Sequence, residues 1–215
     1  MCGLAGFFRH SSASERQHHS LWLEAMGQAI NHRGPDASSV FLDDQVAMTH
    51  RRLSILDLTE AGTQPMTSAS GRYVIAFNGE IYNYREIRGE LDQAGLAFRT
   101  QTDTEVLLEL YERIGVRCLD RLNGMFAFAV WDKQTGELFL ARDRLGKKPL
   151  YYYQAGESFA FGSEIKALLK LPFVHCEARP DAIKDFFAYQ YIPDPKTIYR
   201  NVHKLAPGHW LKTDG

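Results

Sequence analysis

The fold is decided by one apolar stretch, Met125-Phe126-Ala127-Phe128-Ala129-Val130-Trp131. A strand with one face in water alternates apolar and polar residues, whereas a strand covered on both faces is apolar at every position. The run Tyr73–Phe77 has the same character. The first run continues through Asp132–Gly136 into Leu138–Ala141, which predicts an antiparallel hairpin. Antiparallel strands buried on both faces predict an α+β fold, with sheets inside and helices outside.

Four segments around these strands carry apolar residues at helical spacing. They are Leu21–Ile30, Tyr84–Ala94, Asp103–Ile114 and a segment that begins at Pro180. The polar stretch Ser11–Ser20 is interpreted as a loop. Residues 1–190 are predicted to form the domain, and residues 191–215, with three prolines, a connector outside its core.

Composition excludes several classes of protein. A chain of 215 residues, 45% hydrophobic, can bury a core without a disulfide or metal. Its 25 Lys+Arg and 26 Asp+Glu give a net charge of −1, which argues against binding to nucleic acid or membrane by bulk attraction. No apolar run approaches the ~20 residues of a transmembrane helix, and the N-terminal stretch lacks the leading positive charge and the apolar length typical of a signal peptide. The three cysteines form neither a disulfide framework nor a metal-binding spacing, which predicts a cytoplasmic protein without a metal site.

A candidate nucleophile stands at Cys2. A single cysteine is more often an inert buried thiol. Removal of Met1, however, would make Cys2 the first residue, with a free α-amine beside its thiol. An α-amine titrates near ~7.7–8.0, so its neutral form could accept the thiol proton and return it to a leaving group. The glycines at positions 3 and 6 permit close approach of a substrate to the backbone.

Three further patterns have both a functional and a structural interpretation. The Asn78 amide and the Gly79 N–H could converge on one oxygen as an oxyanion hole, with Glu80 beside them for a cation, although Asn-Gly is also a common turn. Asp103 fits a helix capping box equally well. Arg52 could clamp a carboxylate or be a solvated strand charge. No Gly-x-Gly pair or phosphate-binding loop occurs, so no nucleotide site is predicted.

A series of short segments in fixed order covers practically the whole chain. The segments are Met1–Gly6, Asn31–Asp36, Arg52–Asp57, Phe77–Asn83, Thr102–Val106, Leu122–Phe128, Arg142–Gly146, Phe161–Glu164 and Leu205–His209. Together they resemble the glutaminase domain of the asparagine synthetases, a branch of the class II glutamine amidotransferases. This resemblance implies an N-terminal-nucleophile hydrolase fold, an αββα four-layer sandwich with two stacked antiparallel sheets.

The resemblance also implies a reaction. The thiol of Cys2 would attack the side-chain carboxamide of glutamine, with its own α-amine as general base. Asn78 and the N–H of Gly79 would stabilise the tetrahedral oxyanion. Ammonia would leave, and water would hydrolyse the γ-glutamyl thioester to glutamate.

Substrate recognition would fall to charged residues of the same motifs. Arg52 would hold the α-carboxylate of glutamine, while Glu80 and Asp103 would hold its α-ammonium. The same glutamine pocket would be lined by Leu53, Ser54, Ile55 and Leu56. A pocket that must bind both the α-carboxylate and the α-ammonium would select free glutamine over glutamine within a peptide. The turn Arg33–Asp36 is interpreted as scaffold or lid support.

Asparagine synthetases continue into a C-terminal domain that uses ATP and Mg²⁺ to activate aspartate and receives the ammonia. The resemblance therefore implies that this chain, without a cofactor of its own, is the glutaminase part of a longer protein whose synthetase domain is its partner; a homodimer is left open. One alternative is the same chemistry serving a carbohydrate, peptide or lactam-forming acceptor. Another is a non-catalytic binding or regulatory module with the same fold.

Overall fold

Two antiparallel β-sheets pack face to face at the centre of this computed structural model, which describes residues 1–8, 16–54 and 59–214. The six-stranded sheet has the order β10 (Val202–Lys204), β8 (Tyr151–Ala155), β9 (Ser158–Gly162), β1 (Gly3–Phe8), β3 (Val46–Arg52), β2 (Ala37–Leu42). The five-stranded sheet has the order β11 (Trp210–Thr213), β7 (Glu137–Arg142), β6 (Gly124–Asp132), β5 (Tyr73–Ile81), β4 (Met66–Thr67).

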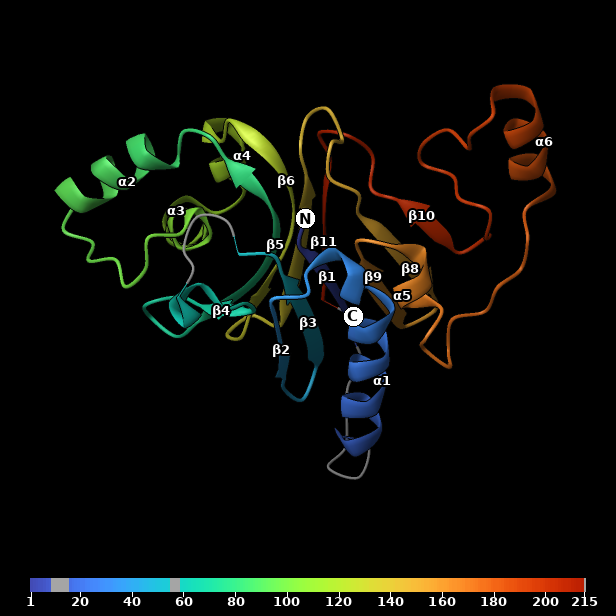
Figure 1. Cartoon of the computed structure of the whole chain (residues 1–215), viewed down its shortest axis with the longest axis horizontal. Coiled ribbons are helices and arrows are strands. Elements are labelled where there is room, and N and C mark those ends of the chain that lie inside the picture. Colours follow the sequence, from blue (N-terminus) through green and yellow to red (C-terminus); the bar gives the residue numbers. More distant parts are fainter. Residues whose placement is uncertain (9–15, 55–58, 215) are drawn as a thin grey trace.

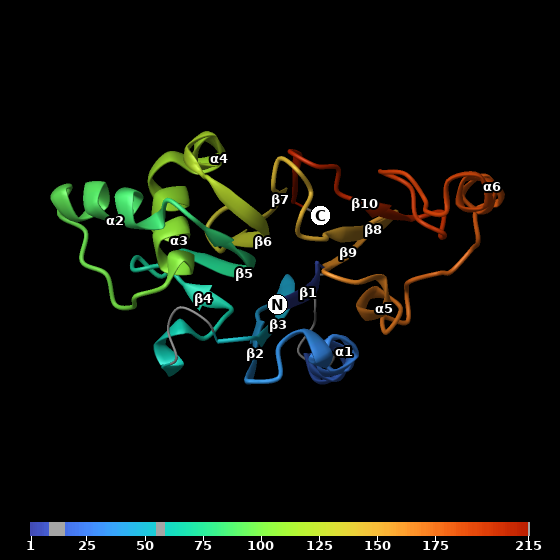
Figure 2. The same ribbon diagram turned by 45° about the horizontal axis from the view of Figure 1, so that its top comes forward.

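Helices lie outside the sheets (Figures 1 and 2). The five-stranded sheet is flanked by α2 (Tyr84–Gln93), α3 (Asp103–Ile114) and α4 (Cys118–Arg121), and the six-stranded sheet by α1 (Arg16–Ala29) and α5 (Ile165–Leu168). The sixth helix, α6 (Pro180–Tyr189), lies at the far end of the molecule. Among the described residues, no helix is long and apolar enough to cross a bilayer. The predicted αββα layering is confirmed.

The two apolar runs are covered on both faces, as predicted. Successive side chains of β5 point to opposite sides of the sheet. Val74 and Ala76 therefore pack between the two sheets, while Ile75 and Phe77 pack against α2 and α3. The same alternation in β6 divides its phenylalanines from its alanines. Both strands lie between β7 and β4 in their sheet, and their apolar faces are covered by the other sheet on one side and by helices on the other.

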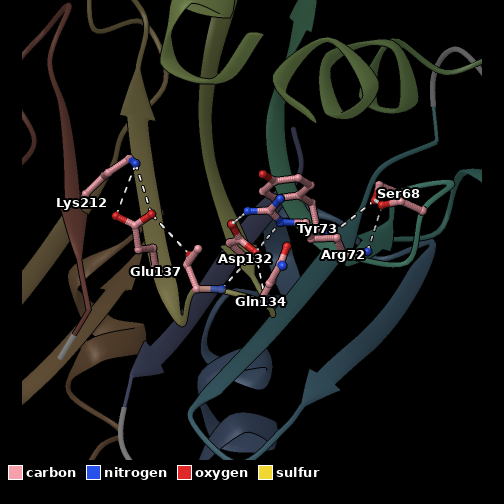
Figure 3. Close-up of polar contacts among 9 residues, drawn as sticks. Ser68, Arg72, Tyr73, Asp132, Gln134, Glu137 and Lys212 are labelled. Atoms are coloured by element: carbon pink, nitrogen blue, oxygen red, sulfur yellow. Dashed lines mark hydrogen bonds and ion pairs between the residues drawn. The ribbon is translucent and has the colours of Figure 1, made fainter. Parts of the chain in front are cut away.

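The predicted hairpin consists of β6 and β7, and its turn is fixed by side chains (Figure 3). Asp132 accepts two hydrogen bonds from Arg72, at 2.8 and 2.6 Å, and a third from the backbone N–H of Gln134 at 2.9 Å. Gly136 closes the turn with φ +72, a conformation that suits glycine. This end of the sheet fixes the register of β5 and β6, which places Asn78 opposite Ala127.

Helix bounds follow the sequence closely in one case and less so in another. Helix α3 spans the predicted residues, and Thr102 caps it by accepting a hydrogen bond from the N–H of Glu105. Helix α1 begins at Arg16 rather than Leu21, so part of the predicted loop is helical. The sequence did not indicate this first part of the helix because its residues are polar. His19, for example, is buried edge-on against Phe7 although histidine is typical of a surface.

The tail differs from the expected connector. Residues 191–215 add β10 to one sheet and β11 to the other, and Val202 and Leu205 are buried. Strands of three and four residues are too short to show a period of two, so the sequence pattern could not indicate them. A boundary at residue 190 toward a further domain stays a prediction.

Candidate functional site

One pocket brings together most of the predicted site residues. Those that line it are Cys2, Arg52, Leu53, Asn78, Gly79, Glu80 and Asp103. Cys2 immediately precedes β1, and Arg52 is the last residue of β3; both strands belong to the six-stranded sheet. Asn78, Gly79 and Glu80 lie in β5 of the five-stranded sheet, and Asp103 is the first residue of α3. The pocket therefore lies where the two sheets meet, and Cys2 and Asp103, 101 positions apart in the sequence, are brought together only by the fold.

The other three residues predicted for the pocket wall are not confirmed there. Ser54 does not line the pocket; its backbone N–H donates to Asp36 Oδ2 at 2.8 Å, which ties the end of β3 to the turn before β2. Ile55 and Leu56 lie outside the described residues. Their predicted place in the pocket stays a prediction.

The Cys2 side chain is held against the backbone of Leu53. The Leu53 N–H donates to the Cys2 sulfur at 3.4 Å, and the thiol lies 3.6 Å from the Leu53 carbonyl oxygen. On the other side, Arg33 Nε donates to the Cys2 carbonyl at 2.9 Å. Arg33 is itself paired with Glu164 at 3.0 Å. The nucleophile candidate is thus fixed at both its side chain and its backbone.

The backbone of Gly79 is turned away from the neighbouring strand. Gly79 is opposite Phe126, whose C=O and N–H are both occupied by Asp143, at 2.8 and 3.2 Å. Residues opposite each other in an antiparallel sheet either exchange both hydrogen bonds or neither. Gly79 and Phe126 therefore form a non-bonded pair, and the N–H of Gly79 points to the other edge of β5.

Neighbouring N–H groups on that edge have acceptors. The N–H of Phe77 donates to Gln64 Oε1 at 2.6 Å, and the N–H of Ile81 donates to Asp103 Oδ2 at 2.9 Å. Between them, the N–H of Gly79 finds no acceptor among the described residues. Strand β4 ends too early along this edge to reach it, since its pairing covers only Val74 and Ile75.

The Asn78 amide is a second unused donor. Its side chain is 1% exposed, and its Nδ2 has no hydrogen-bond partner within the described ranges. A buried amide N–H without an acceptor costs on the order of 1–3 kcal/mol. Such a group is retained where a ligand supplies the missing acceptor. Asn78 and Gly79 thus present two adjacent donors to the pocket that holds the Cys2 thiol.

A buried histidine supports this strand from the other sheet. His50 Nε2 lies 2.9 Å from the carbonyl oxygen of Phe77, directly before Asn78. Burial, assisted by the charge of Arg52, lowers the pKa of His50 to about 4 although its bond to Phe77 opposes this. The imidazole is therefore neutral at physiological pH, and it can donate from Nε2 to Phe77. It holds the strand rather than exchanging protons.

Opposite charges line two parts of the pocket. Arg52 is 8% exposed, and its Nη1 donates to the Thr59 carbonyl at 2.7 Å. Gly62 packs directly on this guanidinium, where a Cβ would overlap it. Burial, together with the charge of Glu80, raises the pKa of Asp103 to about 6 against the hydrogen bond from Ile81. An ammonium group bound here would return Asp103 to its charged form.

Comparison with known proteins identifies this arrangement. A family model described as a glutamine amidotransferase domain matches residues 1–215. The chain belongs to the glutamine amidotransferase family. This membership confirms the resemblance found in the sequence and the prediction that the chain is an enzyme domain.

Relatives of the amidotransferase domain are longer proteins. It is 40% identical over 208 residues to "Asparagine synthetase [glutamine-hydrolyzing] 1" of Bacillus subtilis, covering 97% of this chain and 33% of the relative. It is 38% identical over 225 residues to a putative asparagine synthetase of Methanocaldococcus jannaschii, covering 95% and 42%. A third relative, "Amidase chry2" of Gibberella zeae, is 32% identical over 98% of this chain and 32% of its own length. The chain thus spans about a third of the first relative.

A solved structure shares the fold. The glutamine phosphoribosylpyrophosphate amidotransferase of B. subtilis, solved with ADP and GMP, matches with a TM-score of 0.64 and 23% identity, over 78% of this chain and 43% of that one. This likeness confirms the predicted N-terminal-nucleophile hydrolase fold. Within the described ranges, the amidotransferase domain has no group of three or more His, Cys, Asp or Glu side chains that could hold a metal ion.

Sequence reasoning missed three residues that surround or support the pocket. Arg33 contacts the Cys2 carbonyl, although its turn was interpreted as scaffold. His50 and Lys148 are buried, at 1% and 4% exposure, and Lys148 lines the pocket. A lone basic residue in a strand or charged loop gives no signal of burial, so only the folded amidotransferase domain shows these neighbours.

Proposed function

We propose that this amidotransferase domain hydrolyses free glutamine to glutamate and ammonia, with Cys2 as the nucleophile. The observation that carries the proposal is the pair of unpaired donors at Asn78 and Gly79, in the pocket that holds the Cys2 thiol. Two N–H donors beside a nucleophile match the anion that forms when a carboxamide is attacked. A module that only binds a carboxamide oxygen could use the same donors, but it would not need the thiol beside them.

The reaction follows from these groups once Met1 is removed. The neutral α-amine of Cys2 takes the thiol proton as the sulfur attacks the carboxamide carbon of glutamine. Asn78 Nδ2 and the Gly79 N–H stabilise the resulting oxyanion. The α-ammonium returns the proton to the leaving nitrogen, and ammonia departs. Water, deprotonated by the same amine, then hydrolyses the thioester, releasing glutamate and restoring the thiol.

Recognition of glutamine rests on its two charged ends. The buried guanidinium of Arg52 would bind the α-carboxylate, because its planar donors match carboxylate geometry. Glu80 and Asp103 would bind the α-ammonium. Leu53 lines the pocket, and Ile55 and Leu56 would continue its wall as predicted from the sequence.

The experiment is a release assay with three substrates: glutamine, its N-acetyl derivative and its α-amide. We expect glutamate from glutamine, and turnover of either blocked compound lower by on the order of 10²-fold, because each lacks one of the two charges that Arg52, or Glu80 and Asp103, would bind. Equal turnover of all three would contradict the assignment of Arg52, Glu80 and Asp103. Absence of ammonia release from glutamine in a protein whose mass shows Cys2 as its first residue would support the non-catalytic alternative.

Asp103 should give the reaction a specific pH dependence. Below its pKa of about 6 the carboxyl is neutral and no longer attracts the α-ammonium of glutamine. We expect kcat/KM to fall more steeply below about pH 6 than above it, because this constant reports the groups of the free enzyme. In Asp103→Asn the overall value should be lower and the steeper fall absent. A steep fall that persists in this variant would assign it to another group.

In the intact protein the ammonia would serve an ATP-dependent amidation of aspartate to asparagine. Support comes from the names of the bacterial and archaeal relatives and from the length they have beyond this chain. ATP and Mg²⁺ would then bind outside this chain, in a C-terminal synthetase domain, and the three free cysteines fit a reducing cytoplasm. Formation of asparagine from aspartate, ATP and glutamine by the intact protein tests this acceptor. The match to an amidase keeps a different acceptor as the alternative outcome.

A further inference from the structure

Lys148 is a buried cation beside the nucleophile that the proposed reaction does not use. It lies in the loop between β7 and β8, is 4% exposed, and lines the same pocket as Cys2. Its backbone is fixed from both sides, because its N–H donates to Asp143 Oδ2 at 3.0 Å and its carbonyl accepts from Arg142 Nε at 2.8 Å. The side chain therefore enters the pocket from a rigid loop.

The ammonium of Lys148 has only a weak partner. Its Nζ lies 2.9 Å from the sulfur of Met1, and no carboxylate among the described residues forms an ion pair with it. A thioether is a poor acceptor for a buried ammonium. In a chain that begins at Cys2 this sulfur is gone, and the ammonium then has no hydrogen-bond acceptor of its own among the described residues. A buried cation is retained where an anion forms.

The Cys2 thiol lines the same pocket as Lys148, and it becomes an anion when it loses its proton. Burial lowers the pKa of Lys148 and the nearby Arg33 lowers it further, whereas the negative charges of the Cys2 thiolate, Asp143 and Glu80 raise it. The interaction between two charges is mutual, so a thiolate that favours the ammonium is favoured by it to the same degree. Asp143 is already committed to the backbone of its own loop.

We propose that Lys148 is a positioning residue for the proposed glutaminase reaction: its buried ammonium stabilises the thiolate form of Cys2 once Met1 has been removed. The same charge disfavours protonation of the α-amine of Cys2, so the resting enzyme holds more of the neutral amine, although the charge does not itself drive the thiol proton onto that amine. The effect of Lys148 on attack is therefore to raise the fraction of thiolate. The inference rests on the proposed function, because the thiolate matters only where Cys2 is the nucleophile.

The test measures the rate at which iodoacetamide alkylates Cys2 as a function of pH, since the thiolate is the reactive form. All proteins carry Cys176→Ser to remove the exposed thiol, while Cys118 is buried and burial raises its pKa to about 12. The variants are Lys148→Met, Lys148→Arg and, as matched control, Lys147→Met, which removes an exposed charge from the same loop. Mass spectrometry of the N-terminal peptide confirms that each protein begins at Cys2.

In Lys148→Met we expect the alkylation profile to move up by about one pH unit, with a rate loss of up to about tenfold near neutral pH. Lys148→Arg should restore the wild-type profile, and Lys147→Met should not differ from it. A purely structural role would lower the unfolding temperature without moving the profile. If Lys148→Met does not fold, Lys148→Gln replaces it with a polar, uncharged side chain. If the alkylation profiles of Lys147→Met and Lys148→Met coincide, the inference is overturned.

Alkylation needs no glutamine, so this inference and the proposed function fail separately. A shifted profile in a protein that releases no glutamate from glutamine would overturn the glutaminase proposal alone. Glutamine hydrolysis that depends on Cys2, combined with an unshifted profile in Lys148→Met, would overturn the role of Lys148 alone.

Discussion

Replacing Cys2 with alanine is expected to abolish glutamine hydrolysis and leave the unfolding temperature unchanged. The thiol is the only group at the start of β1 that can form the acyl intermediate, and its contacts with Leu53 are long ones, at 3.4 and 3.6 Å, that contribute little to stability. Loss of a nucleophile that acts together with its base removes nearly all catalysis, on the order of 10⁴-fold or more. Glutamate release and thermal unfolding are measured on the same preparation.

The matched control is Cys176→Ala, which removes an exposed free thiol in the segment before α6. This variant should hydrolyse glutamine at the rate of the wild type. Residual activity in Cys2→Ala comparable to that of the control would show that another group performs the attack.

Replacing Asn78 with alanine should have the second-largest effect. Loss of one donor from an oxyanion hole typically lowers kcat by ~10²–10³-fold. Because Nδ2 of Asn78 has no partner among the described residues, the variant breaks no hydrogen bond of the folded protein through that atom. We therefore expect kcat to fall and KM for glutamine to change little, since the proposed function assigns the two ends of glutamine to Arg52, Glu80 and Asp103.

Asn83→Ala provides the comparison for this prediction. Its amide donates to the Arg121 carbonyl at 2.9 Å, where α2 begins and away from the pocket, so it should affect stability rather than kcat. If Asn78→Ala raises KM and leaves kcat intact, Asn78 belongs to substrate binding and the oxyanion assignment is wrong.

Parts of this molecule could be predicted from the sequence because their signals are local. The run Met125–Trp131 is apolar throughout, so its place in a doubly covered sheet follows from hydropathy alone. Helix α3 could be delimited because Thr102 and Gly115 punctuate it. The tail escaped prediction because β10 and β11 are defined by their neighbours, not by a pattern of their own.

Only those parts of the site that belong to short sequence motifs could be predicted. Asn78 and Gly79 are adjacent in the chain, and their pairing as donors could be inferred before the fold was known. That the N–H of Gly79 is unused depends on the pairing of Phe126 with Asp143, which no local pattern encodes. The same holds for Lys148, which lines the pocket of Cys2 although the two residues are far apart in the sequence.

The most direct test of the central claim is covalent labelling with the diazoketone analogue of glutamine, which alkylates a nucleophile placed at the carboxamide position. The account predicts one label per chain, on the peptide that begins with Cys2, blocked by free glutamine and absent in Cys2→Ala and in protein that retains Met1. Label on Cys118 or Cys176, or glutamine hydrolysis that continues while Cys2 is fully labelled, would contradict it.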